Sequence, residues 1–400
     1  MAQPIRKKIQ EEHPNLIKEE DIYTLLIDGG SLLYACFADG KTSSDGVHYG
    51  AIYQFLLQLR MQLSKKDFDY VYVFFDNEYS GYLRWEIYNE YKANRDKHYS
   101  DYGISEYMKQ YNENLRNMQN YIFNKNKKKT EDKPKVVKEK NDYEKFIDDN
   151  FARERDILCK YFNELFVRWY MDDIVEGDDL IAYYCQNKKP NEKVVIVTGD
   201  GDISQLLQDD ICVYNLQLKK YVTNKTYKEY FGMPCENILI KKIFCGDVSD
   251  NISNISRLSE TALFELMPEI TKRPITVEEV KERAQNLINE RIESKKKPLL
   301  VHQNIVNGVA NKEYDGDFYE INKKIIDLKH PLMTDTAKEE MDSMMYAPQD
   351  PEDRSFGNLY KMINEDNIEE LMSETKFSSF FNIFKRLQEK ELKLYRDSLI

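Results

Sequence analysis

Three short apolar runs stand out along the chain, and each ends at an acidic residue. Their residues are mostly Val, Ile, Leu and Tyr without polar alternation, which is typical of strands buried on both faces of a sheet. The runs and the acids that follow them are Ile22–Ile27 with Asp28, Tyr70–Phe75 with Asp76, and Val194–Thr198 with Asp200. We therefore predict three buried strands with a carboxylate at the carboxyl end of each.

Helical patterns lie between and after these runs. The apolar residues of His48–Leu63 recur every three or four positions and form one stripe. The other predicted helices are Asp156–Trp169, Asp179–Gln186, Glu236–Phe244 and Ser259–Leu266, followed by a long helical region that reaches Ile400 with a loop at Tyr346–Arg354. Strands that alternate with helices predict an α/β fold with a wound, mostly parallel sheet. In such sheets, functional groups collect at the carboxyl ends of the strands.

The composition narrows the classes of protein. The 400 residues include 58 basic and 70 acidic side chains, which gives a formal net charge of −12. This balance argues against a uniform basic coat for DNA or membranes, although acids gathered in a metal site could conceal a basic groove. No apolar run approaches the roughly 18 residues that span a bilayer. The N-terminal segment lacks the apolar core of a signal peptide.

The six cysteines are widely spaced, with no C-x-x-C pair and no histidines grouped near them. We therefore expect neither a disulfide framework nor a zinc site, and a reducing compartment such as the cytoplasm fits. The cysteines are interpreted as small buried hydrophobic residues.

The stretch between Asp96 and Asp156 differs from the rest of the chain. It is rich in Tyr, Asn, Glu and Lys, and its centre, Lys125–Lys140, is dominated by lysine. We interpret it as an insertion between two parts of the sheet domain. Two interpretations stay open: a solvated insertion, or a segment that grips a substrate.

Nine acidic residues gather at predicted strand and helix ends. They are Asp28 and Asp76, then Glu176, Asp178 and Asp179 at a helix start, Asp200 and Asp202 after a strand, and Asp247 and Asp250 after a helix. Carboxylates a few ångströms apart repel one another unless cations compensate them, and oxygen-only ligands suit Mg²⁺. Two such ions about 3.5–4 Å apart can activate a water and stabilise the leaving oxygen of a phosphodiester.

Each acidic cluster also has an ordinary explanation. An Asp after a strand is usually a turn or N-cap residue, and acids at a helix start match the helix dipole. The glycines at Gly199 and Gly201 are similar to part of a dinucleotide fingerprint, but Ser204 replaces the third glycine and nearby aspartates would repel a pyrophosphate. Together, the clusters favour a metal site over any of these explanations.

Five segments match a known family in the order in which that family has them. They are LLIDGGSLLY, VYVFFDNEYSGYLRWEIYNEYKANRDK, VEGDDLIA, VVIVTGDGDISQLL and IFCGDVSDNIS. The sequence resembles the 5′ nuclease (flap endonuclease, PIN-like) superfamily, and within it the T4-type bacteriophage RNase H branch. The resemblance implies a PIN-like nuclease core over residues 1–226, with a helical arch insertion at about 84–156. It also implies a helix-hairpin-helix-like and helical C-terminal region over 227–400.

The resemblance places all nine acids on the family's metal-binding positions, which implies two Mg²⁺ ions, with Mn²⁺ as an alternative. Asp76 and Asp178 among them would take part in catalysis. In the segment EYKANR, Tyr91, Lys92 and Arg95 fall at the base of the family's arch. There Lys92 and Arg95 would contact the scissile phosphate, and an aromatic residue can stack on a base.

Arg84 precedes this segment and is also expected to bind nucleic acid, because Lys and Arg can neutralise transition-state charge on a phosphate. Without the family context, a solvated basic helix face would be the favoured interpretation of the stretch from Arg84 to Arg95.

One segment departs from the family pattern. After GDVSDN, the residues Asn254, Arg257 and Ser259 stand where the family usually has glycines. Glycines let backbone amides approach a phosphate closely. The resemblance therefore does not carry the family's duplex-binding hairpin and its potassium site over to this chain. The phage RNase H branch shares this departure.

The implied function is a metal-dependent 5′ to 3′ exonuclease and flap endonuclease. It would act on RNA–DNA hybrids, flaps and duplex DNA, and it would remove RNA primers during phage replication in the host cytoplasm. Possible partners are a single-strand-binding protein or a sliding clamp, with no membrane. Two alternatives are a PIN-like endoribonuclease that cleaves single-stranded RNA and a non-catalytic DNA-binding replisome protein. The aromatic stripe of Lys376–Leu387 is interpreted as core rather than as a docking tail.

Overall fold

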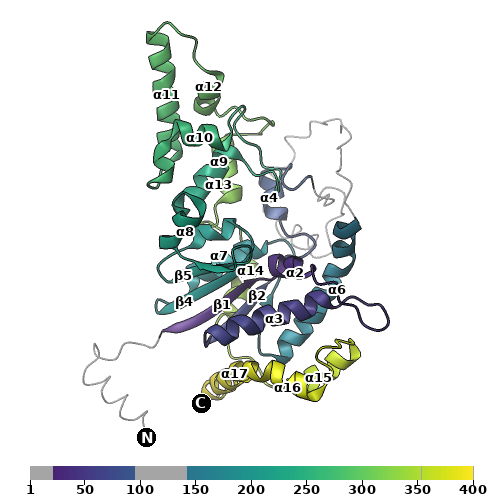
Figure 1. Ribbon diagram of the computed structural model, residues 1–400. Helices are drawn as coiled ribbons and strands as arrows, with labels where there is room; N and C mark the ends of the chain where they lie inside the picture. Colours follow the sequence, from purple (N-terminus) through teal and green to yellow (C-terminus); the bar gives the residue numbers. More distant parts are fainter. Residues whose placement is uncertain (1–20, 95–141, 353, 400) are drawn as a thin grey trace, which may run out of the picture.

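The computed structural model describes residues 21–94, 142–352 and 354–399 (Figure 1). At its centre lies a six-stranded sheet with the order β3-β2-β1-β4-β5-β6. The strands are β1 (Ile22–Asp28), β2 (Tyr70–Phe74), β3 (Arg168–Tyr170), β4 (Glu192–Thr198), β5 (Ile211–Asn215) and β6 (Lys220–Val222). All neighbours pair in parallel except β5 and β6, which are antiparallel. The predicted wound, mostly parallel sheet is confirmed.

Both faces of the sheet are covered, as the apolar runs predict. Alternate residues of β1 point to opposite faces: Leu25 and Ile27 join one hydrophobic cluster, and Leu26 joins another. The first cluster includes residues of α2 (Gly29–Cys36), α3 (Gly50–Lys65) and α6 (Asp142–Glu164). The second includes residues of α7 (Gly177–Asn187), α8 (Asn224–Phe231) and α14 (Asp335–Met344). The central strands β1 and β2 are therefore enclosed on both faces, whereas Lys220 and Tyr221 of the edge strand β6 are exposed.

The predicted helix Asp156–Trp169 is wrong at its end. The helix α6 stops at Glu164, and Phe166 takes a left-handed φ of 57° that breaks the helical path. The chain then forms the edge strand β3, in which Arg168 pairs with Tyr72 of β2. Arg168 is buried and forms an ion pair with Glu391 in the C-terminal helix. A helical spacing of apolar residues could not reveal this distant partner.

The chain after β6 builds a helical region on one end of the sheet. Its short hydrophobic cluster includes Phe244, Ile255, Leu263 and Ile305. The helices are α9 (Ile238–Cys245), α10 (Glu260–Leu266), α11 (Val277–Glu293), α12 (Leu300–Asn307) and α13 (Phe318–Ile326). The boundary between residues 226 and 227 stays a prediction. The short helix α4 (Tyr82–Ile87) and the turn after it, as far as residue 94, belong to the described residues. The central part of the predicted arch lies outside them, and the description resumes with α6.

The last helices return to the sheet and close its lower end (Figure 1). They are α15 (Phe356–Glu365), α16 (Glu374–Phe381) and α17 (Lys385–Ser398). Phe377, Phe381 and Phe384 are buried in the same cluster as β1. The prediction that the aromatic stripe is core is therefore confirmed.

Four of the six cysteines are buried, as expected of small hydrophobic residues. A helix able to cross a bilayer is not found in the described part of the chain, where every helix is too short or too polar for that role.

Candidate functional site

β1 ends at Asp28, whose side chain caps the helix that follows. Its carboxylate accepts the backbone N–H of Ser31 at 2.9 Å and the hydroxyl of Thr198 at 2.6 Å. Thr198 is the last residue of β4, and its hydroxyl oxygen accepts the N–H of Asp200 at 2.8 Å. The carboxyl ends of two neighbouring strands are thus tied together. Asp28 and Asp200 lie at the same edge of the sheet as a result.

Asp76 follows β2, on the other side of β1, and faces the start of α7. Its carboxylate accepts the N–H of Gly177 at 2.7 Å. A Cβ atom at Gly177 would lie 3.3 Å from this carboxylate, so a larger residue would crowd it. Asp178 comes next, in the first turn of α7, where the helix dipole favours negative charge.

Asp28, Asp76, Asp178 and Asp200 form what we call the carboxylate quartet. Loss of hydration raises the pKa of Asp178 well above its ordinary value, and the charges of the other three members raise it further. Loss of hydration also raises the pKa of Asp28 to about 7, although two hydrogen bonds oppose the shift. No basic side chain is among the main influences on either pKa. Without a cation, burial and the neighbouring carboxylates therefore disfavour the charged forms of Asp28 and Asp178.

The donor chemistry of the quartet fits a divalent cation. Every donor is a carboxylate oxygen, which hard ions such as Mg²⁺ prefer, and a cation would relieve the mutual repulsion. Among the described residues, however, no three His, Cys, Asp or Glu side chains already stand close enough together to hold an ion. Repulsion between like charges acts to keep such side chains apart. The metal-binding roles therefore stay predictions.

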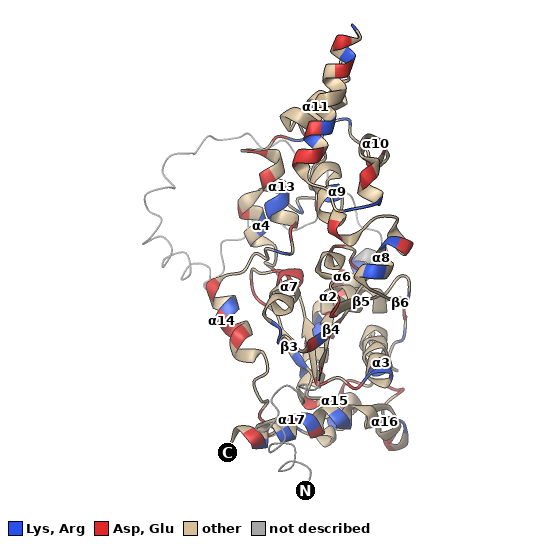
Figure 2. Cartoon of the chain, turned by 90° about the vertical axis from the view of Figure 1, so that its left-hand side faces the viewer, with Lys and Arg blue, Asp and Glu red and all other residues tan. Residues whose placement is uncertain are grey.

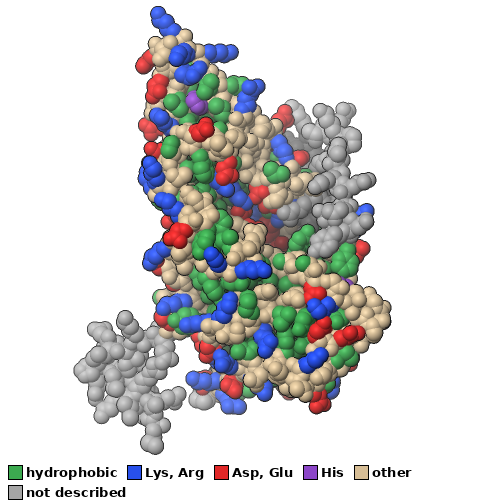
Figure 3. Space-filling view, viewed as in Figure 1, with side chains coloured by type: hydrophobic (Ala, Val, Ile, Leu, Met, Phe, Trp, Pro, Cys, Tyr) green, Lys and Arg blue, Asp and Glu red, His purple; other side chains and the backbone are tan. Residues whose placement is uncertain are grey.

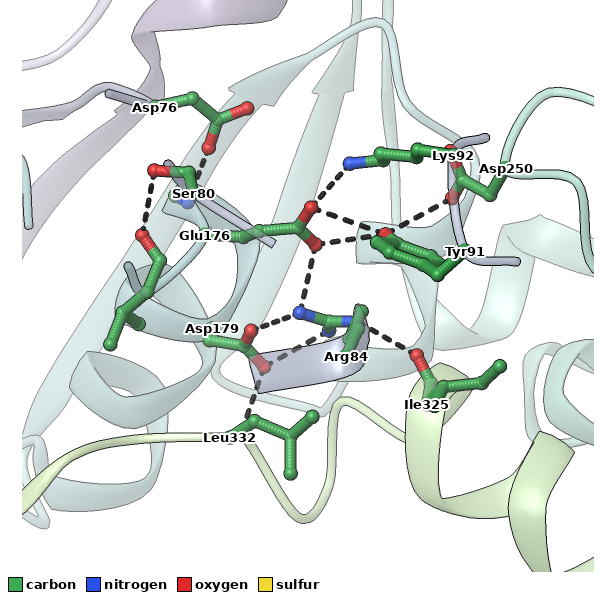
Figure 4. Close-up of polar contacts among 12 residues, drawn as sticks. Asp76, Ser80, Arg84, Tyr91, Lys92, Glu176, Asp179, Asp250, Ile325 and Leu332 are labelled. Atoms are coloured by element: carbon green, nitrogen blue, oxygen red, sulfur yellow. Dashed lines mark hydrogen bonds and ion pairs between the residues drawn. The ribbon is translucent and has the colours of Figure 1, made fainter. Parts of the chain in front are cut away.

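A second group of acids beside the quartet is neutralised by a buried arginine (Figure 4). The Nη1 atom of Arg84 lies 2.8 Å from a carboxylate oxygen of Glu176, and the guanidinium also forms a two-pronged ion pair with Asp179. Its Nε–H donates to the carbonyl of Ile325 at 2.8 Å. Asp179 in turn accepts the N–H of Leu332 at 2.9 Å. These contacts join α4, α7 and the end of α13.

Glu176 has two further partners, which come from the turn after α4. The ammonium group of Lys92 forms an ion pair with its carboxylate, and the hydroxyl of Tyr91 donates to it at 3.0 Å. Loss of hydration alone would raise the pKa of Glu176, but the charges of Lys92 and Arg84 lower it to about 2. We call these residues the Arg84 cluster: Arg84, Tyr91, Lys92, Glu176 and Asp179.

This arrangement bears on two sequence-based expectations. Arg84 is only 5% exposed, Tyr91 2% and Lys92 9%, because acids at the start of α7 bind all three internally. The interpretation of these residues as a solvated basic helix face is therefore wrong. Their roles in nucleic-acid binding and catalysis stay predictions, and Arg95 lies outside the described residues.

Two of the three remaining predicted metal ligands contact Lys242, a residue that no pattern in the sequence singles out. Its ammonium group lies 2.5 Å from a carboxylate oxygen of Asp247 and also contacts Asp202. Loss of hydration acts to raise the pKa of Asp247, but Lys242 lowers it to about 2. Asp250 lies apart from this pair, and the hydroxyl of Tyr91 reaches it at 3.5 Å. The only signal for Lys242 in the sequence is its place in the last turn of α9, which many surface lysines share.

Comparison with known families shows which family this chain belongs to. A model of the family described as "5′-3′ exonuclease, N-terminal resolvase-like domain" matches residues 23–232, more than half of the chain. The chain belongs to this 5′-3′ exonuclease family. Membership confirms the resemblance to the 5′ nuclease superfamily, whereas the T4-type branch stays a prediction.

Curated relatives of this 5′-3′ exonuclease family member share parts of its sequence. A 5′-3′ exonuclease of Buchnera aphidicola subsp. Schizaphis graminum is 32% identical over 111 residues, which are 27% of this chain and 38% of the relative. DNA polymerase I of Bacillus subtilis is 23% identical over 308 residues, which are 73% of this chain and 29% of the relative. The chain thus spans well under half the length of either relative.

Two solved structures from bacteriophage T5 share the fold. The T5 5′-exonuclease with bound zinc has a TM-score of 0.52 and 16% identity, over 86% of this chain and 98% of that one. A T5 flap endonuclease in a pseudo-enzyme–product complex with DNA and metal ions has a TM-score of 0.51 and 14% identity, over 92% and 99% of the two chains. At these identities the likeness supports the fold alone, and it confirms the predicted PIN-like α/β architecture.

The glycine-poor segment of this family member keeps an ordered turn. Arg257 adopts a left-handed φ of 66°, a backbone conformation that favours glycine. Ser259 caps α10 by accepting the N–H of Ala262 at 3.1 Å, and the side chain of Asn254 donates to the carbonyl of Leu258 at 2.8 Å. Side-chain hydrogen bonds therefore stabilise a turn in which the family usually has glycines.

Proposed function

We propose that this chain is a divalent-metal-dependent 5′ nuclease that hydrolyses phosphodiesters near the 5′ ends of flaps, RNA–DNA hybrids and duplex DNA. The observation that carries the proposal is the carboxylate quartet, in which burial and repulsion disfavour the charged forms of Asp28 and Asp178 and a bound cation would favour them. Membership of the 5′-3′ exonuclease family supports it. So do the solved T5 relatives, which were observed with zinc or with DNA and metal ions.

The quartet residues would hold the cation, for which Mg²⁺ is the expected choice and Mn²⁺ an alternative. A bound divalent ion supplies charge stabilisation and lowers the pKa of a coordinated water. Asp76 and Asp178 would lie next to the reacting phosphate. Lys92 is held by its ion pair with Glu176 and by its backbone N–H, which donates to the carbonyl of Asp250 at 2.8 Å. Lys92, together with Arg95, would steer the phosphate.

The second predicted metal set consists of Asp200, Asp202, Asp247 and Asp250. Within it, the single positive charge of Lys242 is shared by Asp202 and Asp247, and it offsets only part of their combined negative charge. A second cation there would therefore bind mainly through water, or would compete with the ammonium group of Lys242.

The finer expectations belong to the same proposal. They are removal of RNA primers during phage replication, action in the host cytoplasm, and a single-strand-binding protein or sliding clamp as partner. The resemblance to the T4-type phage branch motivates them.

The test uses 5′-labelled flap, nicked-duplex and RNA–DNA substrates with titrated Mg²⁺. We expect products that carry a 5′-phosphate, and a loss of at least about 10- to 100-fold in rate for Asp178→Asn, because loss of even a hydrogen-bond partner of a metal ligand typically costs that much. The matched control is Asp335→Asn, whose carboxylate is 95% exposed and lies on α14.

Three results would contradict the proposal. Full activity in the double variant Asp76→Asn/Asp178→Asn would exclude the quartet from catalysis. Cleavage of single-stranded RNA in preference to flapped duplex would favour the endoribonuclease alternative. Binding of duplex without metal-dependent turnover would favour the non-catalytic DNA-binding alternative.

A further inference from the structure

The hairpin formed by α11 and α12 projects from the molecule at the end opposite the C-terminal helices (Figures 1 and 2). Its base is anchored by Val280, Ala284 and Ile288, which are buried. Beyond Ile288, no residue of α11 is buried, and the turn into α12 is exposed. A helix of this length spans about 25 Å at 1.5 Å per residue. The turn is therefore carried well outside the hydrophobic core.

Hydrogen bonds hold this turn in one conformation. The N–H of Lys296 donates to the carbonyl of Arg291 at 2.8 Å, and the Nε–H of Arg291 donates back to the carbonyl of Lys297 at 2.8 Å. Between them, Lys295 takes a left-handed φ of 53°, and its N–H donates to the carbonyl of Ile292 at 2.9 Å. The backbone of the turn is thus fixed before any partner binds.

Three consecutive lysines, Lys295–Lys297, are presented by this backbone, and we call them the lysine turn. All three are exposed, and within the described part of the chain none forms an ion pair with a carboxylate. Figure 3 shows Lys and Arg side chains gathered over this projecting end. The chain as a whole carries a net charge of −12, so an uncompensated basic turn is a local exception.

We propose that the lysine turn binds the phosphate backbone of a duplex arm of the substrate, at a distance from the carboxylate quartet. The proposal rests on the nuclease function, which brings such a duplex to the chain. Lysines act as point charges on flexible stems, so they can follow successive phosphates without reading bases. Each lysine that neutralises a phosphate releases counterions, which makes the contribution dependent on salt.

The separation of the lysine turn from the quartet gives the proposal a length dependence. An arm that ends before the turn gains nothing from these lysines, whereas a long arm that runs past the turn can contact them.

The experiment compares the wild-type chain with K295A/K296A/K297A. Dissociation constants are measured by fluorescence anisotropy without divalent metal, between 50 and 200 mM KCl. Flapped substrates carry arms of 8 or 24 base pairs, and one arm is lengthened at a time. The control K361A/K376A/K385A removes the same charge from exposed lysines on α15, α16 and α17, at the opposite end of the molecule.

For one of the two long-arm substrates, the one whose long arm reaches the lysine turn, we expect the Kd of K295A/K296A/K297A to rise about tenfold. The slope of log Kd against log salt concentration should fall by about one per lysine. Short-arm substrates bind wild type and variant alike. The cleavage position and the rate at saturating substrate stay the same, because the lysine turn lies outside the quartet.

An unchanged Kd and salt slope on both long-arm substrates would overturn the proposal, and so would an equal loss in K361A/K376A/K385A. Ile292, Leu299 and Leu300 beside the turn are exposed, so binding to anionic phospholipid vesicles is measured as well. Loss of vesicle binding with duplex binding intact would also overturn the proposal. If the wild-type chain binds duplexes but cleaves none, the nuclease function fails, while the Kd comparison still tests the lysine turn.

Discussion

Adjacent residues at the start of α7 belong to two groups of acids that the protein treats in opposite ways. Asp178 belongs to the quartet, whose members raise its pKa. Asp179 is held by a two-pronged ion pair with Arg84. Neighbouring positions on a helix point about 100° apart, so one carboxylate faces the strand ends and the other faces α4. Two acids in one helical turn thus differ: Asp179 is paired with a basic residue, and Asp178 lies among other acids.

The two groups differ in their expected roles. We call the Arg84 cluster the frame of the site, because its contacts hold the surrounding helices in place, whereas the quartet is expected to take part in the chemistry. The Arg84 cluster is fully paired and ties three helices together, as expected of a structural ion-pair network. The quartet instead gathers carboxylates at one edge of the sheet, where burial and their charges raise the pKa of Asp28 and Asp178, an arrangement that costs stability and is common at functional sites. Two substitutions test whether this separation is real.

The largest expected effect is that of Arg84→Met, which removes the buried guanidinium. Glu176 and Asp179 would then stay buried with one partner fewer, and breaking such a pair typically lowers the free energy of unfolding by about 3–5 kcal/mol. Urea unfolding followed by far-UV circular dichroism measures the change.

Arg273→Met is the matched control for Arg84→Met. Arg273 also pairs with a glutamate, but it is half exposed, so its removal should change the free energy of unfolding far less. If the two variants lose equal stability, the Arg84 cluster does not form the frame of the site.

The opposite sign is expected for Asp178→Asn. Without divalent metal, the neutral amide relieves repulsion within the quartet, and the free energy of unfolding should rise by about 1 kcal/mol. Saturating Mg²⁺ should stabilise the wild-type chain, because a ligand that binds only the folded state shifts the equilibrium by mass action. The variant should gain much less from Mg²⁺.

Thermal unfolding in EDTA and in Mg²⁺ measures both parts of this prediction. Asp335→Asn serves again as the exposed control and should behave like the wild-type chain in both buffers. Destabilisation of Asp178→Asn in EDTA would show that this carboxylate belongs to the frame, contrary to the comparison drawn above.

The sheet could be predicted from the sequence because its signals are local. Continuous apolar runs in β1, β2 and β4 mark buried parallel strands, and all three occur in the structure. The short strands β3, β5 and β6 escaped prediction. β3 depends on Arg168, whose partner Glu391 lies more than two hundred residues away in the chain. A pairing over that distance leaves no periodic pattern to detect.

The acids of the site could also be predicted, but their partners could not. Asp28 and Asp76 follow strands, and a parallel sheet brings their carboxylates to one edge. Which carboxylate meets a basic group depends on how α4 and α9 pack against α7. Arg84 and Lys242 resemble ordinary surface residues in the sequence, although both form ion pairs with predicted metal ligands.

The smallest expected effect concerns Glu154, a buried acid outside the site. Its partner is a histidine, whose charge depends on pH, rather than an arginine. His48 is buried with Nδ1 2.5 Å from a carboxylate oxygen of Glu154 and Nε2 2.7 Å from the carbonyl of Asp39. Both neighbours are acceptors, so the charged imidazolium satisfies the geometry. Loss of hydration lowers the pKa of His48, but the hydrogen bonds to Glu154 and to the carbonyl of Asp39, together with the charge of Glu154, outweigh it and the net shift is upward. Arg153, which also contacts Glu154, opposes the shift.

Because the folded pKa lies above the unfolded value of 6.5, this contact stabilises the fold fully below that pH. Its contribution is lost as the pH rises through the folded pKa. His48→Gln should therefore cost about 1 kcal/mol at pH 6 and progressively less toward pH 9, as expected of a hydrogen bond to a charged group. Urea unfolding across this range measures the difference. The exposed His330 pairs with Asp327 on the surface, so His330→Gln should change stability little at any pH. If wild type and His48→Gln give parallel stability profiles, His48 does not carry the charge that neutralises Glu154, and permanently charged partners such as Arg84 would be the only kind that this fold uses in its interior.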